Sequence, residues 1–144
     1  MKKDYRQLGA YGIIINNGQI LLIKKNSGPY DGKLDLPGGT IEMGEKPIDA
    51  LKRELMEEVG INVIDCELFD VDSVNFDWKY QDEIINVHHV GIFYKILKYD
   101  GEIKKENIID EVNDDSLGAD FYKISELKKD NLSKIVNMEL DKIK

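Results

Sequence analysis

Three glutamates, Glu54, Glu57 and Glu58, stand three and four residues apart in the middle of the chain. On an α-helix this spacing places their carboxylates on one side, on adjacent turns, where like charges repel by roughly 0.2–0.5 kcal/mol per pair. A hard divalent cation such as Mg²⁺ reverses that sign, because it prefers oxygen ligands and binds through carboxylates, phosphates and water. The three residues therefore indicate either a cation site or an acidic, solvated helix face partly balanced by Lys52 and Arg53.

The segment before these glutamates favours the cation site. Leu36-Pro37-Gly38-Gly39 ends in a bend without side chains, which lets backbone carbonyls and amides approach a ligand. Glu42 and Glu45 follow in a loop that contains Gly44. Carboxylates and an open backbone would then meet at the start of one helix.

The helix that must hold the glutamates is clearly marked in the sequence. Pro47 suits a first helical turn, and Gly60 suits the position just after the last turn, where a positive φ is wanted. Between them an apolar stripe recurs at helical spacing and predicts a buried face. The stripe is formed by Ile48, Leu51, Leu55 and Val59.

Residues 39–61 resemble the Nudix box, a 23-residue signature written G-x5-E-x7-R-E-U-x-E-E-x-G-U, in which U is a bulky aliphatic residue. Every specified position is filled in this sequence. The matching residues are Gly39, Glu45, Arg53, Glu54, Leu55, Glu57, Glu58, Gly60 and Ile61. The Leu-Pro-Gly-Gly segment and the order of predicted strands extend the resemblance, less specifically, across most of the chain.

The resemblance implies a Nudix hydrolase, which cleaves a nucleoside diphosphate linked to a further moiety X by attack of water on phosphorus. It implies Mg²⁺ as cofactor, with Mn²⁺ as the alternative, and a small nucleotide as substrate. The implied metal ligands are Glu54, Glu57 and Glu58, with the Gly38 carbonyl as a further ligand. The number of metal ions, the nucleotide and the moiety X stay open.

Arg53 and the general base are further catalytic candidates. We expect Arg53 to point away from Glu54 and to hold Glu45 or Glu57 by charge-assisted hydrogen bonds. Within the box Glu57 is favoured as general base, with Glu54 as the alternative. Outside the box, the resemblance points to an acidic residue before a late aromatic strand. Asp115 is the better match there, and Asp114 is the second.

Candidate substrate contacts lie inside and outside the box. The backbones of Gly38 and Gly39 can approach a ligand, and Lys24 at the end of a predicted strand can meet phosphate as a point charge, as can its neighbour Lys25. Trp78 is the aromatic residue favoured to stack on a base, because the polar residues around it predict a loop at 77–83. The pair His88-His89 lies in a predicted strand, so the two rings face opposite sides and are interpreted as structural.

The remaining pattern predicts an α/β fold in one domain over residues 1–144, and the resemblance implies a Nudix-like α/β/α sandwich with a mixed β-sheet. We expect the first structured segment to begin near Leu8, and a hairpin to form around Asn16-Asn17-Gly18. Further predicted elements are a short strand at 33–37, strands at 62–75, 84–97 and 118–123, and a helix at 131–143.

Composition narrows the class of protein. The 144 residues carry a net charge of −8, which argues against binding a nucleic-acid polymer. No apolar run approaches the length of a membrane span, and no secretory signal is visible. A single cysteine, Cys66, fits a reducing compartment, so we expect a cytoplasmic protein. Dimers are common in the family, and a homodimer is the expected assembly, although no motif specifies it.

The box leaves two functional hypotheses. The first is a pyrophosphohydrolase acting on a nucleoside triphosphate or similar nucleotide. No proline follows the box, whereas the ADP-ribose and NADH subgroups of the family carry one there, and this absence favours a triphosphate. The second is a nucleotide-sensing module that kept the fold and lost turnover. An intact box favours the first. A dimeric interaction protein with incidental carboxylates is a third, weaker reading.

Overall fold

The computed structural model describes residues 2–105 and 116–143. Its longer sheet is mixed and has the strand order β5-β1-β7-β6. β1 runs parallel to β7, whereas the pairs β5–β1 and β6–β7 are antiparallel. The strands are β1 (Lys2–Ile13), β5 (Gly38–Thr40), β6 (Asn62–Tyr80) and β7 (Glu83–Asp100). The predicted mixed sheet is therefore confirmed.

A second sheet is built around β3 (Gln19–Lys25), which pairs with three neighbours. These neighbours are β2 (Ile15–Asn16), β4 (Leu34–Asp35) and β8 (Ser116–Lys123). The apolar run of β3 does not alternate with polar residues because both faces are covered. Leu21 and Ile23 pack into one hydrophobic core, and Ile20 and Leu22 pack into the other.

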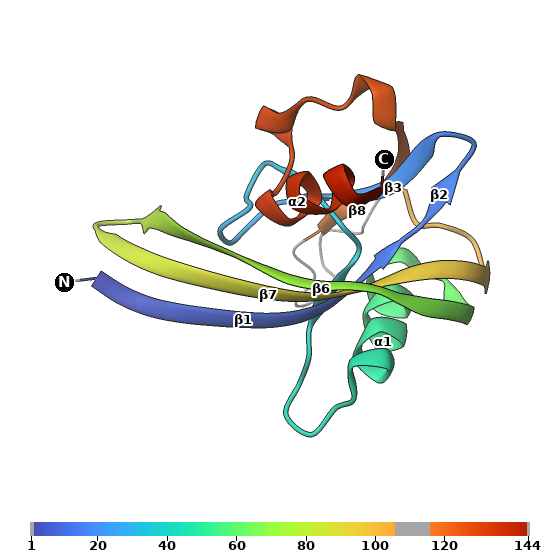
Figure 1. The fold of residues 1–144 in the computed structure, drawn as a ribbon, viewed down its shortest axis with the longest axis horizontal. Helices are drawn as coiled ribbons and strands as arrows, with labels where there is room; N and C mark the ends of the chain where they lie inside the picture. Colours follow the sequence, from blue (N-terminus) through green and yellow to red (C-terminus); the bar gives the residue numbers. More distant parts are fainter. Residues whose placement is uncertain (1, 106–115, 144) are drawn as a thin grey trace.

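Two helices lie on opposite sides of the longer sheet (Figure 1). α1 (Pro47–Val59) packs against β1 and β5 and closes the first core, whereas α2 (Lys134–Ile143) closes the second. Short 3-10 turns, η1 (Ile124–Glu126) and η2 (Lys129–Asn131), connect β8 to α2. This arrangement confirms the predicted α/β/α sandwich. Within the described residues, no helix has the length and apolar character needed to cross a membrane.

Local signals in the sequence located several elements well. Asn17 and Gly18 both have positive φ and form the two-residue turn of the β2–β3 hairpin. Pro47 is the first residue of α1, and Gly60 follows its last residue with φ 85°, donating its N–H to the carbonyls of Leu55 and Met56. The predicted helix at 131–143 is shorter than expected and begins at Lys134, because Asn131 ends η2 and Leu132 forms a bridge with Leu34.

Two predictions of extent were wrong. β1 begins at Lys2 rather than near Leu8, because pairing with β7 holds the polar N-terminal residues in a strand. The segment around Trp78 is not a loop, since β6 continues to Tyr80 and the turn comes at Gln81 and Asp82. Polar composition misled the prediction because this part of the sheet is solvated, and solvated strands carry polar side chains.

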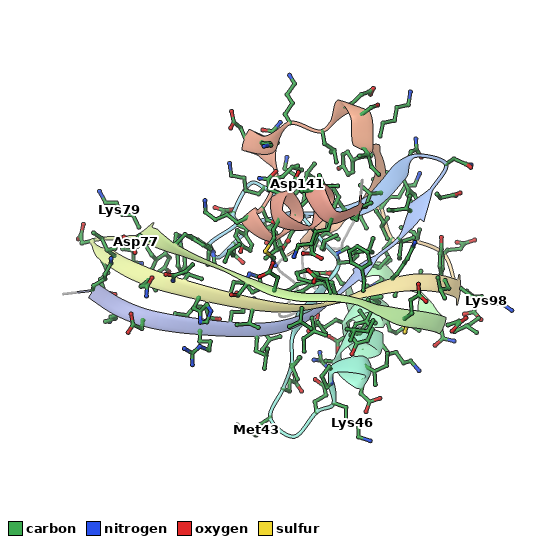
Figure 2. The ribbon with its side chains drawn as sticks, in the orientation of Figure 1. Met43, Lys46, Asp77, Lys79, Lys98 and Asp141 are labelled. Carbon is green, nitrogen blue, oxygen red and sulfur yellow. The ribbon has the colours of Figure 1, made fainter. Side chains whose placement is uncertain are left out.

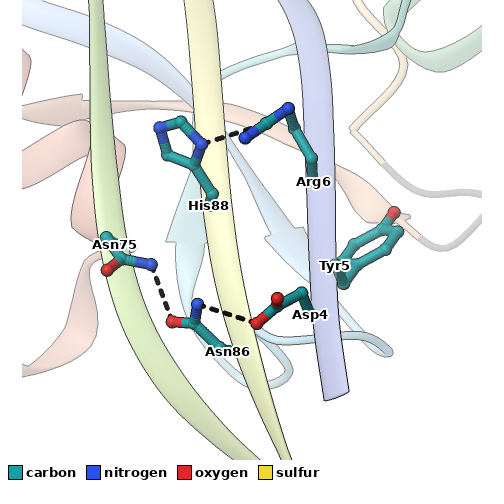
Figure 3. Close-up of a pocket in the computed structure, with 6 residues that line it drawn as sticks. All are labelled: Asp4, Tyr5, Arg6, Asn75, Asn86 and His88. Atoms are coloured by element: carbon teal, nitrogen blue, oxygen red, sulfur yellow. Dashed lines mark hydrogen bonds between the residues drawn. The ribbon is translucent and has the colours of Figure 1, made fainter.

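The extra length forms a three-stranded arm of residues 2–7, 74–80 and 83–89, which extends beyond both helices (Figure 1). Asp77 and Lys79 lie at its far end, opposite to Lys98 at the other end of the sheet (Figure 2). On one face of the arm a shallow cavity of about 550 Å³ is lined by polar side chains (Figure 3). Arg6 donates to His88 at 3.1 Å, so this cavity is bordered by groups that bond to one another across the strands.

A buried glutamate links α2 to β6. Glu139 is 1% exposed, and neither of its carboxylate oxygens has a hydrogen-bond partner within the described residues. Lys142 forms ion pairs with Asp70 and Asp72 at 2.5 Å and lies 3.4 Å from Glu139. One ammonium thus faces three carboxyl groups. Burial, followed by the charge of Asp70, raises the pKa of Glu139 to about 7.

This cluster predicts a pH-dependent stability. The folded protein holds a proton on Glu139 that the unfolded chain releases above about pH 4.5, so the contribution to stability is complete below that pH and is lost as the pH rises through 7. Glu139→Gln stays neutral, and we expect its Tm at pH 8 to exceed that of the wild type by roughly 2–4 °C. Thermal unfolding from pH 4.5 to 8 measures this.

The matched control is Glu126→Gln, which removes an exposed carboxylate from η1. Its Tm should follow that of the wild type at every pH. An unchanged difference between Glu139→Gln and the wild type across this range would contradict the assignment.

Candidate active site

The site begins at the edge strand β5. Pro37 C=O and Ile41 N–H form the flanking hydrogen bonds to β1. Since alternate residues of an antiparallel strand bond to a given neighbour, the N–H and C=O of Gly38 face away from β1. The Gly38 N–H donates to Oε1 of Glu58 on α1, with 2.9 Å between nitrogen and oxygen. The backbone of β5 therefore faces a carboxylate.

Both glycines of this strand are required by close contacts. Gly38 has φ 137°, and a Cβ there would lie 2.2 Å from the Ala10 carbonyl oxygen. A Cβ on Gly39 would lie 2.7–2.9 Å from the carboxylate atoms of Glu54. Gly38 therefore makes room for the backbone of β1, and Gly39 makes room for the Glu54 carboxylate.

Two of the three glutamates are withdrawn from water. Glu58 is 5% exposed, and burial raises its pKa well above the usual range, against the opposing effect of the Gly38 N–H. Burial also raises the pKa of Glu54, whose carboxylate is held by Arg53. The charge of Glu57 adds to the upward shift of the Glu54 pKa, and the charge of Glu54 adds to that of the Glu58 pKa. A positive charge at this place would stabilise the ionised forms.

Arg53 joins the helix to the loop before it. Its guanidinium donates to both oxygens of Glu45, at 2.8 and 2.9 Å, and to the carbonyl of Thr40 at 3.1 Å. The hydrogen bonds from Arg53 lower the pKa of Glu45 to about 2. The same guanidinium also donates to Glu54 at 2.9 Å. The expectation that Arg53 points away from Glu54 was therefore wrong, because its long side chain folds back along the helix.

The Glu57 side chain is constrained less by contacts and burial than those of Glu54 and Glu58. Its side chain is 62% exposed, and Arg53 Nη1 lies 3.4 Å from its Oε2. It projects from α1 without the burial that fixes Glu58. Glu57 therefore has the freedom to reorient that the buried pair lacks.

A cavity of about 300 Å³ opens beside the buried pair. Glu54 and Glu58 line it together with the backbone of Gly38 and Gly39. The lysine that lines it is Lys25, whose charge lowers the pKa of both glutamates. The structure thus brings the glycines and two glutamates to one cavity.

Other predicted site residues lie elsewhere. Lys24 is exposed and precedes Lys25 on β3, so it faces the other side of the strand. Trp78 lies on the arm, where its ring contacts that of Tyr80 with 4.8 Å between centroids. Asp114 and Asp115 lie outside the described residues. The candidate base from the late segment is therefore not placed.

In one part of the cavity wall, sequence reasoning named Tyr30 as a candidate to stack on a base but missed Tyr11 and the contact of both with His89. Tyr11 and Tyr30 line the cavity, and both hydroxyls meet the buried ring of His89. His89 and His88 face opposite sides of β7, as predicted, and His89 is 1% exposed. The glycine at position 9 was an available signal, since a small residue before Tyr11 leaves room for a ring over the sheet.

The donor atoms at this cavity fit a hard divalent cation. Carboxylate oxygens of Glu54 and Glu58 and the outward carbonyl of Gly38 are the oxygen ligands that Mg²⁺ prefers. Within residues 2–105 and 116–143, no three His, Cys, Asp or Glu side chains already stand close enough together to hold an ion. The two raised pKa values provide the reason for a cation here, because it would offset the cost of burying two charges.

The Arg53–Glu45 pair predicts a second pH effect. The depressed pKa of Glu45 contributes stability above about pH 4.5 that is lost as the pH falls toward 2. Glu45→Gln should therefore lower Tm at pH 7, and the difference from the wild type should shrink between pH 4.5 and 2. Thermal unfolding at graded pH measures it. Glu42→Gln, 3.9 Å from Arg53 and 68% exposed, is the control, and an equal loss there would contradict the assignment.

Comparisons with known proteins agree with this geometry. The sequence model of the NUDIX domain matches residues 6–137. The chain is 38% identical over 104 residues to an 8-oxo-dGTP diphosphatase of Haemophilus influenzae, covering 71% of this chain and 70% of that protein. It is 31% identical over 136 residues to an ADP-ribose pyrophosphatase of Methanocaldococcus jannaschii, covering 89% and 73%.

The fold agrees as well. The crystal structure of a MutT NUDIX hydrolase from Burkholderia pseudomallei superposes with a TM-score of 0.76 at 25% identity, covering 97% of this chain and 99% of that one. A complete box, a buried carboxylate pair at the Gly-Gly bend and a domain match over residues 6–137 lead to one conclusion. The chain belongs to the Nudix hydrolase family.

Proposed function

We propose that this protein is a Mg²⁺-dependent pyrophosphohydrolase that cleaves a nucleoside triphosphate to the monophosphate and pyrophosphate. Water attacks phosphorus, and the anhydride oxygen leaves with the pyrophosphate. The observation that carries this proposal is the pair of the buried Glu58 and the partly buried Glu54, set against the backbone of Gly38 and Gly39 at one cavity. Several oxygen ligands at one cavity fit a divalent cation, and a cation held there can also bind phosphate oxygens.

The chain's own residues would hold and orient the reactants. Glu54, Glu58 and the Gly38 carbonyl would hold the cation, with Glu57 as a further ligand or the base. Bound Mg²⁺ supplies positive charge that neutralises the diphosphate and favours the deprotonation of water. Lys25 would add a point charge for a phosphate oxygen from the opposite wall. Arg53 donates a hydrogen bond to Glu54 and so positions one of the residues that would hold the cation.

Glu57 is the general base we favour inside the box. Glu58 is committed to the Gly38 N–H, and Glu54 is committed to Arg53. Glu57 is exposed, and its contact with Arg53 is the longer one at 3.4 Å. A base must reach the attacking water, and the less constrained carboxylate has the freedom to do so. Glu54 is the alternative.

A nucleoside triphosphate is the substrate class we favour. One relative is named an 8-oxo-dGTP diphosphatase, and another is named an ADP-ribose pyrophosphatase. The names of the relatives therefore do not agree on one substrate class. This chain has prolines at positions 29, 37 and 47, and none follows the box, unlike the ADP-ribose subgroup. The choice therefore falls on the triphosphate.

A nucleotide panel with Mg²⁺ tests the proposal. We expect wild type to release pyrophosphate from at least one nucleoside triphosphate. Glu57→Gln should lower kcat by about 10²–10⁴, the usual contribution of a positioned base. Asp49→Asn removes an exposed carboxylate from the first turn of the same helix and should keep the wild-type kcat. Tight nucleotide binding without turnover by wild type, or full activity in Glu57→Gln, would contradict the proposal.

A further inference from the structure

A buried group of three rings forms one wall of the cavity. The Tyr11 hydroxyl lies 2.6 Å from Nε2 of His89, and the Tyr30 hydroxyl lies 2.8 Å from Nδ1 of the same ring. Tyr11 and Tyr30 are 2% and 6% exposed, and both line the cavity that contains Glu54 and Glu58. The three side chains come from β1, the loop before β4, and β7. We call them the Tyr–His–Tyr network.

Two glycines hold the network in place. Gly9 on β1 and Gly91 on β7 are register partners in the sheet. A Cβ on Gly9 would lie 2.4 Å from the Tyr11 hydroxyl, and a Cβ on Gly91 would lie 2.4 Å from the ring of Phe93. The two rings therefore lie over a hollow in the sheet and stack on each other with 5.8 Å between centroids. The hollow at these glycines thus fixes the position of the Tyr11 hydroxyl next to His89.

The network has one hydrogen more than its two hydrogen bonds use. Burial, with the nearby charge of Lys25, lowers the pKa of His89 to about 4, so its ring is neutral at pH 7. A neutral ring has one N–H and one bare nitrogen, and each hydroxyl has one hydrogen. Three hydrogens are thus available, and the two contacts use two. The third stays on the hydroxyl that accepts from the ring N–H.

That third hydrogen has no acceptor in the described part of the chain. Besides its contact with His89, the Tyr11 hydroxyl accepts a hydrogen bond from the side-chain amide nitrogen of Gln7 at 3.5 Å. Both tyrosines border the cavity, so the spare hydrogen is available to a ligand there. A buried donor left without an acceptor destabilises the protein, and an acceptor on a bound ligand would remove this cost.

The character of this wall selects the part of a nucleotide that meets it. Burial raises the pKa of both tyrosines and lowers that of His89, so the network carries no charge at neutral pH. The charged residues Lys25, Asp35, Glu54 and Glu58 line the same cavity, where the lysine suits phosphate and the carboxylates suit its cation. An uncharged aromatic wall with one donor suits a nucleobase that offers an oxygen.

We propose that the Tyr–His–Tyr network donates its spare hydrogen to a keto oxygen of the substrate's base and so makes the enzyme prefer keto bases. This inference rests on the proposed nucleotide hydrolysis. His89 is a positioning residue, because it acts through the two hydroxyls. The ring tautomer and the ligand are coupled: a keto oxygen bound at one hydroxyl fixes the N–H of His89 on the nitrogen that faces that hydroxyl.

The tautomer is the direct readout. Histidine labelled with ¹⁵N is introduced into the full chain, and His88→Gln assigns the two ring signals. We expect His89 to be neutral at pH 7 and to settle into a single tautomer when saturated with α,β-methylene-dGTP and Mg²⁺. Binding of this analogue with unchanged tautomer populations would overturn the inference while leaving hydrolysis intact. Failure of every triphosphate to bind or react would overturn both.

Kinetics supply the second readout. We expect Tyr11→Phe or Tyr30→Phe to lower the ratio of kcat/KM for dGTP over dATP about tenfold, the value of one hydrogen bond. Tyr80→Phe makes the same change at an exposed tyrosine at the end of β6, outside this cavity, and should keep the wild-type ratio. An unchanged ratio in both network variants, with dGTP still hydrolysed, would overturn the inference. Because each variant stays close to the original in shape, Tm checks that both remain folded.

Discussion

The hydrogen bond from the Gly38 N–H to Glu58 is the constraint on which the rest of the site depends. It brings the edge of β5 and one face of α1 together and takes a carboxylate out of water. Such a burial is costly unless the charge is met by donors or a cation. Glycine is required on both sides of this contact, because a Cβ on Gly38 would collide with the Ala10 carbonyl and a Cβ on Gly39 would collide with Glu54. The glycines, the helix and the raised carboxyl pKa values are thus parts of one arrangement.

Around this contact the residues of the box differ in burial and in role. Glu58 is buried, Glu54 is partly buried, Arg53 and Glu45 tie the helix to its preceding loop, and Glu57 stays exposed. Met43 and Lys46 project from that loop into solvent (Figure 2). A chain with a net charge of −8 can still attract a polyanion under this scheme, because a cation held by the carboxylates sets the local charge.

Sequence reasoning succeeded where a single residue type decides the geometry. Pro47 and Gly60 bounded α1, Asn17 and Gly18 marked the first hairpin turn, and the box spacing put Glu54 and Glu58 at one site. It failed where tertiary contacts decide. The polar residues near Trp78 form a solvated arm, which composition cannot distinguish from a loop.

Two failures concern side chains rather than elements. The direction of Arg53 depends on where Glu45 lies in the folded loop, and helical spacing alone does not contain that information. His89 lies 78 residues after Tyr11 and 59 after Tyr30, so the contact of Tyr11 with His89 follows from the pairing of β1 with β7 and from the hollow at Gly9 and Gly91. Periodicity identifies a strand but not its partner in the sheet.

The central claim is that this carboxylate site directs water to the anhydride next to the nucleoside monophosphate. The most direct measurement is ³¹P NMR of wild-type enzyme with dGTP and Mg²⁺. The account predicts resonances of dGMP and pyrophosphate that grow together and stop when EDTA removes the metal. Formation of dGDP and orthophosphate, or the same turnover in EDTA, would contradict it.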